Sequence, residues 1–137
     1  HETKRVENIC VFDNGKKLVV ACDTVTLWDL TKGVEIRTFQ GHPGAICVGV
    51  SPNGKFMATG WYDGIMKLWS IDTGDMLAEF QAHEANCDWL SFSPDGLSLL
   101  SAGGGKFEDG KGVKGSDHVA RIWKIDELTP KKIKVKN

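Results

Sequence analysis

Short apolar stretches alternate with glycine-containing turns along most of the chain. Between residues 46 and 80, the stretches 46–50, 55–60, 65–71 and 76–80 are rich in apolar residues. The turn signals between them are Asn53-Gly54, Asp63-Gly64 and Thr73-Gly74. Short apolar stretches joined by such turns predict four strands connected as hairpins. No part of the chain shows sustained helical periodicity, so the sequence predicts an all-β fold.

The third of these stretches carries apolar residues on both of its alternating faces. Ile65 and Trp69 lie on one face, and Met66 and Leu68 lie on the other. A strand with two apolar faces is typical of a sheet that packs between two neighbouring sheets. We therefore expect this unit to be covered on both sides.

The unit recurs along the chain. Trp28 is followed 41 positions later by Trp69 and a further 54 positions later by Trp123. Gly41-His42 returns as Ala82-His83, again 41 positions later. The turn 51–54 (Ser-Pro-Asn-Gly) returns as 93–96 (Ser-Pro-Asp-Gly), and Asp13-Asn14-Gly15 resembles both. The chain therefore contains three copies of one unit of about 41 residues.

Composition and charge narrow the classes of function. The 137 residues include 16 glycines, above the usual ~7%, as many turns would require. Lys plus Arg total 17 and Asp plus Glu 18, for a net charge of -1, which argues against general affinity for nucleic acid or an anionic membrane. No apolar run reaches membrane-spanning length.

The four cysteines, Cys10, Cys22, Cys47 and Cys87, include no Cys-x-x-Cys pair. Their spacing indicates neither a zinc site nor a redox motif. Free thiols fit a reducing compartment, so we expect a cytoplasmic or nuclear protein. The polar start His1-Glu2-Thr3 is no signal peptide, and a leading His indicates a tag remnant, a processed chain or a fragment.

The repeated His-to-Trp interval with a Ser-Pro-Asx-Gly turn inside it resembles the WD-repeat β-propeller family. Trp28-Asp29 matches the dipeptide that names the family, whereas Trp69-Ser70 and Trp123-Lys124 keep only the Trp. The resemblance covers roughly residues 6 to 136. It implies three four-stranded antiparallel sheets, or blades, of an incomplete or oligomer-completed propeller. The expected blades are one at about 6–40, two at 41–81 and three at 82–137, with an inserted loop at 103–116.

The resemblance also implies that a buried hydrogen-bond chain of His, Ser or Thr, Asp and Trp locks each blade. The matching residues are His42, Thr59, Asp63 and Trp69 in the second unit, and His83, Ser101, Asp117 and Trp123 in the third. A catalytic triad is the alternative interpretation, but repetition at blade spacing favours structure over catalysis. We expect this hydrogen-bond chain to be incomplete in the first unit, where Ala21 stands in place of Thr59 and Asp23 is only five residues before Trp28.

Members of the family usually bind partners on the face that carries the strand four-to-one and two-to-three loops. The candidates on that face are Trp61, Tyr62, Asn86, Asp88 and Trp89, with Lys106, Phe107, Lys111 and Lys114 on the inserted loop. Aromatic residues at an exposed rim suit a binding hot spot. Packing against an adjacent blade is the alternative for Trp61 and Trp89.

The inserted loop adds twelve residues to the interval seen in the second unit. Gly105-x4-Gly110-Lys111 matches most of a nucleotide-binding loop. The match fails at Gly112, which stands where that motif has Ser or Thr, and a strand rather than a helix is expected to follow. We therefore rank nucleotide or phosphate binding low, and expect no cofactor, no metal and no catalytic residue.

Three units are fewer than the four to eight blades of a closed propeller. The resemblance and this shortage favour a non-catalytic scaffold for protein or peptide partners. The alternative is an arc that self-associates, for example as a six-blade homodimer, or that lacks blades present in a longer chain. The tail 131–136, with its four lysines, is expected to form strand four of the last blade, with a basic docking strip as the alternative.

Overall fold

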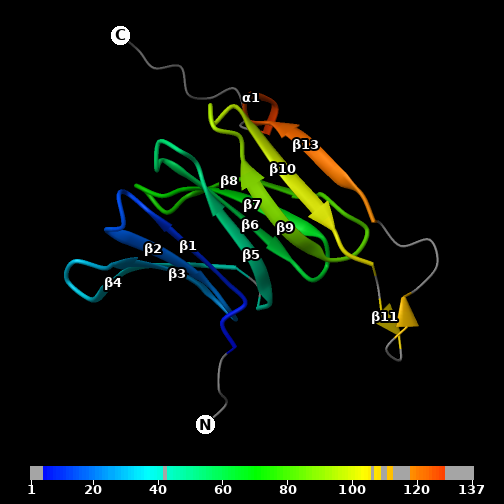
Figure 1. Cartoon of the computed structure of the whole chain (residues 1–137), viewed down its shortest axis with the longest axis horizontal. Helices are drawn as coiled ribbons and strands as arrows, with labels where there is room; N and C mark the ends of the chain where they lie inside the picture. The colour runs from blue at the N-terminus through cyan, green and yellow to red at the C-terminus, as the bar shows by residue number, and fades with distance from the viewer. Residues whose placement is uncertain (1–4, 42, 106, 109–110, 113–117, 129–137) are drawn as a thin grey trace.

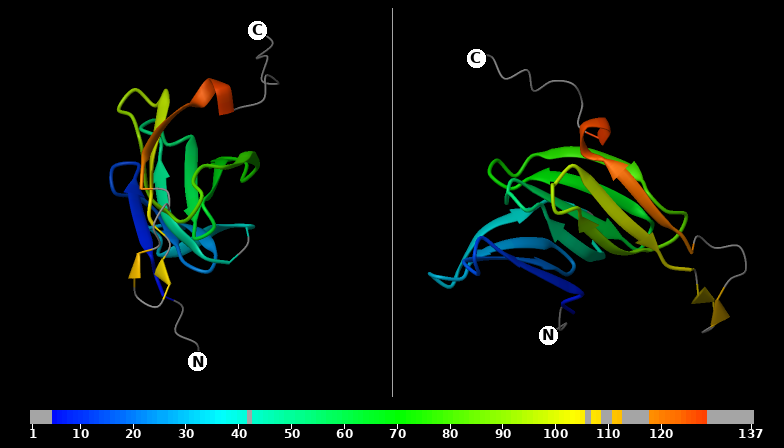
Figure 2. Two further views of the ribbon diagram at one scale, coloured as in Figure 1. Left: turned by 90° about the vertical axis from the view of Figure 1, so that its right-hand side faces the viewer. Right: turned by 45° about the horizontal axis from the view of Figure 1, so that its top comes forward.

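The structure is a computed structural model, and it describes residues 5–41, 43–105, 107–108, 111–112 and 118–128. Three antiparallel sheets stand side by side as an arc in chain order (Figures 1 and 2). We call them blades 1, 2 and 3. The all-β class predicted from the sequence is confirmed.

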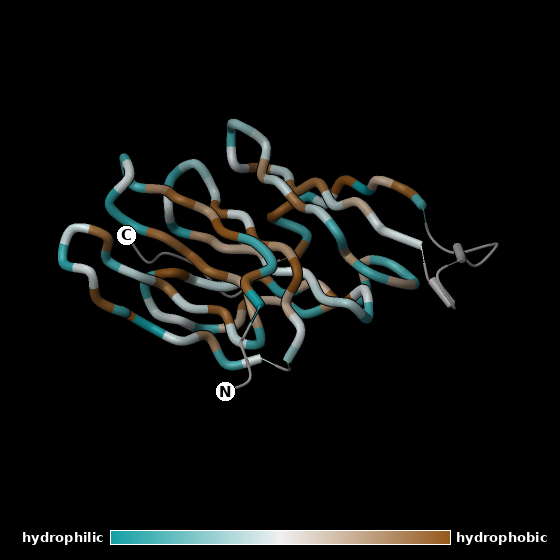
Figure 3. The backbone as a smooth tube through the Cα atoms, turned by 60° about the horizontal axis from the view of Figure 1, so that its bottom comes forward, coloured by the Kyte–Doolittle hydropathy of each residue, from teal (hydrophilic) through white to brown (hydrophobic). Residues whose placement is uncertain are grey.

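Blades 1 and 2 each have four strands in sequential order. Blade 1 comprises β1 (Asn8–Phe12), β2 (Lys17–Ala21), β3 (Val25–Asp29) and β4 (Val34–Phe39). Blade 2 comprises β5 (Ala45–Val50), β6 (Phe56–Trp61), β7 (Ile65–Ser70) and β8 (Met76–Gln81). Hydrophobic residues concentrate in the strands and hydrophilic ones in the connecting turns (Figure 3).

Blade 3 has three strands within the described residues, in the order β13, β10, β9. They are β9 (Cys87–Phe92), β10 (Ser98–Gly103) and β13 (Ala120–Lys124), followed by the short helix α1 (Ile125–Leu128). A small hairpin, β11 (Phe107–Glu108) and β12 (Lys111–Gly112), lies within the inserted loop. The fourth strand expected at 131–136 lies outside the described residues. No helix among the described residues is long and apolar enough to cross a membrane.

The repeated Ser-Pro-Asx-Gly sequence builds the same turn in blades 2 and 3. The Ser51 hydroxyl donates to Asn53 Oδ1 at 2.7 Å and accepts from the Phe56 amide at 2.9 Å. The Ser93 hydroxyl likewise donates to Asp95 Oδ1 at 2.5 Å, and accepts from the amide of Ser98 at 3.0 Å. The glycine that closes each turn has a φ near +70°, a conformation that glycine adopts without steric cost. The motif therefore fixes where the first strand of blades 2 and 3 ends.

The hydrophobic core lies between the blades rather than within one. One cluster joins Val19, Leu27 and Phe39 of blade 1 to Met57 and Trp69 of blade 2. A second cluster joins blade 2 to blade 3; its members include Cys47, Ala58, Met66, Leu68, Cys87, Leu90 and Leu99. Blade 2 is thus covered on both faces, and β7 is buried at four of its six positions, as its two apolar faces predicted.

The outward face of blade 3 is apolar but uncovered. Trp89, Leu100 and Ile122 are 62%, 42% and 68% exposed. Strand register matches them to Cys47, Ala58 and Leu68 of blade 2, which are all buried against blade 3. The outward face of blade 3 therefore has the chemistry of an interface between blades.

Adjacent leucines on β10 offer a matched test of this architecture. Leu99 is 1% exposed between blades 2 and 3, whereas Leu100 points to the uncovered side. We expect Leu99→Ala to lower the free energy of unfolding by about 2–5 kcal/mol, because it removes buried methyl groups and leaves a cavity. Leu100→Ala should cost less than about 1 kcal/mol. Urea unfolding at a concentration where the chain is monomeric measures both, and equal costs would contradict the assigned packing.

Candidate functional site

The polar residues singled out in blade 2 meet inside the sheet. Trp69 Nε1 on β7 donates to Thr59 Oγ1 on β6 at 2.8 Å, and both side chains are buried. Asp63 lies in the tight β6–β7 turn, where its Oδ1 accepts from the Ile65 amide at 3.1 Å. His42, the remaining member of the expected chain, lies outside the described residues. The Thr–Trp pair joins the two central strands of the blade.

Blade 3 repeats this arrangement, and here the histidine, His83, is among the described residues. Ser101 Oγ accepts from Trp123 Nε1 at 2.8 Å and lies 2.8 Å from His83 Nε2. His83 and Ser101 are both buried. Asp117 lies outside the described residues. The sequence spacing therefore identified three side chains that the fold does bring together.

Arg121 joins this cluster, and the sequence analysis missed it. Its Nη1 donates to the Ala82 carbonyl at 3.0 Å and lies 2.8 Å from His83 Nδ1. A guanidinium group can only donate, so Nδ1 must accept and Nε2 must carry the proton that points at Ser101. The signal was available, because Arg121 stands two residues before Trp123, where blade 2 has Lys67.

That arrangement opposes the catalytic-triad alternative. A general base needs an unprotonated ring nitrogen facing the serine hydroxyl. In this cluster the nitrogen of His83 that faces Ser101 is the donor, and the acceptor nitrogen faces Arg121. The cluster is therefore built to hold β10, β13 and the chain before β9 together.

Blade 1 satisfies its tryptophan differently. Trp28 Nε1 donates to Thr26 Oγ1 on its own strand at 2.9 Å. The strand register pairs Val20 with Thr26, as Thr59 pairs with Lys67 in blade 2. Val20, not Ala21, therefore stands in the place of Thr59, and the predicted alignment was wrong by one residue. No hydroxyl is present on β2 at this place, and Thr26 supplies one from the neighbouring strand.

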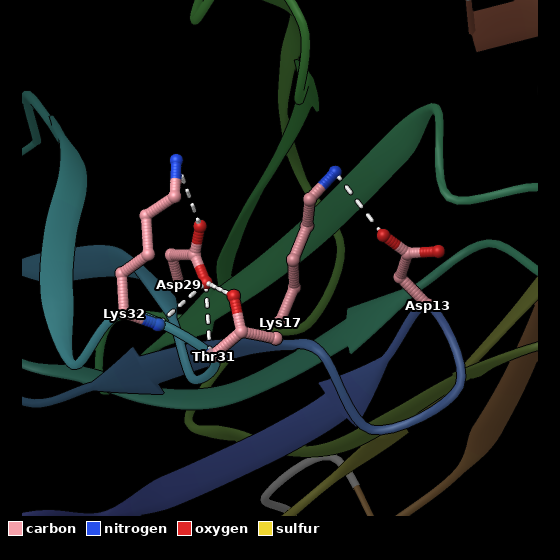
Figure 4. A network of polar contacts seen from close by, with 5 residues as sticks. All are labelled: Asp13, Lys17, Asp29, Thr31 and Lys32. Carbon is pink, nitrogen blue, oxygen red and sulfur yellow. Dashed lines mark hydrogen bonds and ion pairs between the residues drawn. The ribbon is translucent and has the colours of Figure 1, made fainter.

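The Trp-Asp dipeptide of blade 1 organises the turn after β3. Asp29 Oδ1 accepts from the Thr31 hydroxyl at 2.6 Å and from the amides of Thr31 and Lys32 (Figure 4). The Thr31 hydroxyl bond is the largest influence that lowers the pKa of the Asp29 carboxyl. Blade 2 has Ser70 instead, whose Oγ accepts from the Thr73 amide at 3.3 Å. Serine therefore replaces the aspartate of the motif as a turn-capping acceptor.

The two aromatic residues predicted on the rim of blade 2 separate in the structure. Trp61 is 1% exposed, in the cluster between blades 1 and 2, with Lys67 Nζ 4.9 Å from its ring centroid. Packing, the alternative given for it, is what the structure shows, because Trp61 shares the face of β6 that carries buried Met57 and Thr59. Tyr62 is 52% exposed on the β6–β7 turn.

The remaining candidates belong to blade 3 and its loop. Asn86 is half-buried, and its carbonyl accepts from the Gly104 amide at 3.0 Å, whereas Asp88 is exposed. Trp89 is exposed on the uncovered face of the blade. Phe107 and Lys111 lie on the small hairpin, and Lys106 and Lys114 lie outside the described residues.

Two hollows lie at the opposite edge of the blades, beside the turns between first and second strands. One, of about 390 Å³, lies between blades 1 and 2 and is lined by Phe12, Lys17, Lys55 and Asp72 among others. The other, of about 580 Å³, lies between blades 2 and 3 and α1, with Phe56, Leu97, Asp95 and Glu127 on its walls. Each is assembled from separate repeats, so repeat-by-repeat analysis did not reveal it. Among the described residues, no three His, Cys, Asp or Glu side chains are grouped as metal ligands.

Sheets of this order, packed face to face with a Trp–hydroxyl bond inside each, define a fragment of a β-propeller. The family model described as "WD domain, G-beta repeat" matches residues 33–70 and 74–124, more than half of the chain. The chain therefore belongs to the WD40 repeat family. Solved structures share its fold; the WD40 repeats of RRP9, for example, align with a TM-score of 0.78 at 17% identity, over 94% of this chain and 38% of that one.

Curated relatives are similar over parts of the chain. Autophagy-related protein 16 of Arabidopsis thaliana is 32% identical over 74% of this chain and 21% of its own length. Eukaryotic translation initiation factor 3 subunit I of Phaeosphaeria nodorum is 40% identical over 53% of this chain and 22% of its own length. Pre-rRNA-processing protein IPI3 of Mycosarcoma maydis is 46% identical over 40% of this chain and 9% of its own length. The matched segments thus span about a fifth or less of these relatives.

The Trp–hydroxyl bonds predict a graded response to loss of the hydroxyl. Thr59→Val keeps the shape of the side chain but leaves the buried Trp69 N–H without its acceptor, which should cost about 1–3 kcal/mol of unfolding free energy. Thr26→Val is the matched control, because Trp28 is only half-buried and water can replace the lost acceptor. We expect a clearly smaller cost there. Chemical denaturation measures both, and a Thr59→Val variant as stable as the parent chain would refute the structural role.

Proposed function

We propose that the chain is a non-catalytic scaffold module that binds protein or peptide partners through the edge carrying the strand four-to-one and two-to-three connections. The similarity to a subunit of a translation initiation factor supports an assembly role. The polar clusters of blades 2 and 3 support the non-catalytic part of the proposal, because their side chains form hydrogen bonds with one another inside the blades.

Tyr62 is the observation that carries this proposal. Its ring lies beyond the end of β6, half exposed, and its hydroxyl is 3.5 Å from Glu7 Oε1 at the start of blade 1. Gly44, which leads into β5, lies against the same ring. Elements of two blades therefore hold Tyr62 at this edge, with an apolar face and a polar tip, as suits an interaction hot spot.

The end faces of the arc favour a second candidate, closure by self-association. Besides Trp89, Leu100 and Ile122 on blade 3, blade 1 exposes Ile9 and Val11 on its outward side. Strand register matches Ile9 to Val48 and Val11 to Val50, which face blade 1 from blade 2. The two ends therefore carry the two complementary halves of an inter-blade interface. A second copy would cover both ends in a six-blade ring, and further blades of a longer chain would cover the same faces.

A peptide-binding experiment tests the role of Tyr62. Peptides selected from a random phage-displayed library on the 137-residue chain should lose at least about tenfold in affinity with Tyr62→Ser, because truncating a hot-spot residue costs about 2 kcal/mol or more and about 1.4 kcal/mol is tenfold. Met76→Ser is the matched control, since Met76 is similarly exposed but lies on β8. Calorimetry of both variants, checked for folding by circular dichroism, decides. Selected peptides that bind both variants equally would remove Tyr62 from the site.

Light scattering across a concentration series tests closure. A ring of two copies should have twice the 15.0 kDa mass of the chain. Ile122→Lys should shift it to monomer, because a charge would be buried in the new interface, whereas Met76→Lys should leave the mass unchanged. A monomer at every concentration would refute self-association and leave further blades as the cover of the end faces.

A further inference from the structure

Two thiols face each other across the interface between blades 2 and 3. Cys47 lies on β5 and Cys87 on β9, and their sulfur atoms are 3.9 Å apart. Both residues are buried free cysteines within the second core cluster. The Cys47 thiol also lies 2.9 Å from the Cys87 carbonyl oxygen, to which it donates. The Cys47 side chain therefore reaches the backbone of the neighbouring blade.

Glycine allows this close approach. A Cβ on Gly60 would lie 2.7 Å from the Cys47 sulfur and 2.6 Å from the Cys87 sulfur, so both sulfurs rest on the bare backbone of β6. Gly49 plays a similar part on β5, where a Cβ would lie 2.7 Å from Leu90 Cδ1. The inner strands of the two blades thus pack with little between them. A disulfide needs the sulfurs to close to about 2.05 Å, a movement of less than 2 Å from their present separation.

We propose that Cys47 and Cys87 are a disulfide-forming pair that covalently joins blades 2 and 3 when a small-molecule disulfide such as oxidised glutathione acts as the oxidant. One cysteine thiolate attacks a glutathione sulfur, which breaks the glutathione disulfide and releases one glutathione. The other cysteine then attacks the protein sulfur of the mixed disulfide and releases the second glutathione. The protein loses two protons and two electrons, which the two released glutathione thiols carry, and one disulfide bond replaces another.

The surroundings of the pair make the exchange slow in the closed structure. The side-chain hydrogen bond with the Cys87 sulfur, followed by burial, raises the pKa of the Cys47 thiol far above its ordinary value. The reactive species is the thiolate, and glutathione has to reach a buried site. Exchange therefore requires blade 3 to separate locally from blade 2. The geometry of the closed structure therefore determines the equilibrium constant for forming the Cys47–Cys87 disulfide, and not the rate of the exchange with glutathione.

The test uses the 137-residue chain with Cys10→Ser and Cys22→Ser, which leaves only the proposed pair. The protein is equilibrated without oxygen in glutathione buffers of graded redox ratio, starting from both the reduced and the oxidised chain, and the disulfide fraction is measured by mass after acid quenching. The same measurement is made in concentrated guanidinium chloride. If the fold holds the pair ready to bond, the equilibrium constant should be at least about tenfold larger in the folded chain.

An equal or smaller constant in the folded chain would overturn the proposal, because the native core would then reject the bond. The oxidised chain should also melt at a higher temperature than the reduced one, and dithiothreitol should reverse the shift. Cys87→Ser is the matched control, and its melting temperature should not respond to the redox ratio. If the double substitution prevents folding, differential alkylation and peptide mapping of the unaltered chain give the same comparison, with a Cys47–Cys87 peptide as the expected product.

Discussion

The structure depends on the burial of each sheet by its neighbour. A blade of this chain has two apolar faces, so a sheet covered on only one side leaves hydrophobic surface in water. Blade 2 shows the satisfied state, with Met57 and Trp69 against blade 1 and Ala58 and Leu68 against blade 3. The arrangement gives each blade its stability from the next one along the chain. It also leaves an apolar face uncovered at each end of an arc, and such a face associates favourably with a further blade.

Within each blade, the tryptophan imposes a second demand, since an indole N–H that is wholly or partly removed from water needs an acceptor, most strictly at the buried Trp69. The three blades meet it with a hydroxyl, from Thr59, Ser101 and Thr26. Two hydroxyls come from the second strand and the last comes from the third strand, directly across from the usual place. The requirement is therefore for a hydroxyl within hydrogen-bond reach of the indole, which residues at two cross-strand positions can supply. This explains how blade 1 keeps its tryptophan without the full polar chain.

The sequence predicted the repeats, the strands and the bonded pairs of blades 2 and 3, because each depends on spacing along one repeat. It was incomplete or wrong where a residue's place depends on the strand beside it. Alignment of the first repeat with the second placed Ala21 at the hydroxyl position, whereas cross-strand register places Val20 there. For Trp61 the sequence left rim exposure and packing both open, and the face of β6 that Trp61 shares with Met57 decides for packing. Arg121 on β13 reaches His83, which precedes β9 and is 38 residues earlier in the chain. The closeness of the Cys47 and Cys87 sulfurs depends on packing between sheets, which spacing along the chain does not encode.

Exposed aromatic residues in such an arc have two different origins, and comparison between blades separates them. Trp89 is exposed, but the residue at its place in blade 2, Cys47, is covered by blade 3. Trp89 is therefore exposed because, within the described residues, no further sheet covers the outward face of blade 3. Tyr62 lies on a turn beyond the strand end, outside the surface that adjoining sheets cover. Of the two, Tyr62 would stay accessible in a closed ring, and this is the physical reason why we propose partner binding at Tyr62 and assembly at the face that carries Trp89.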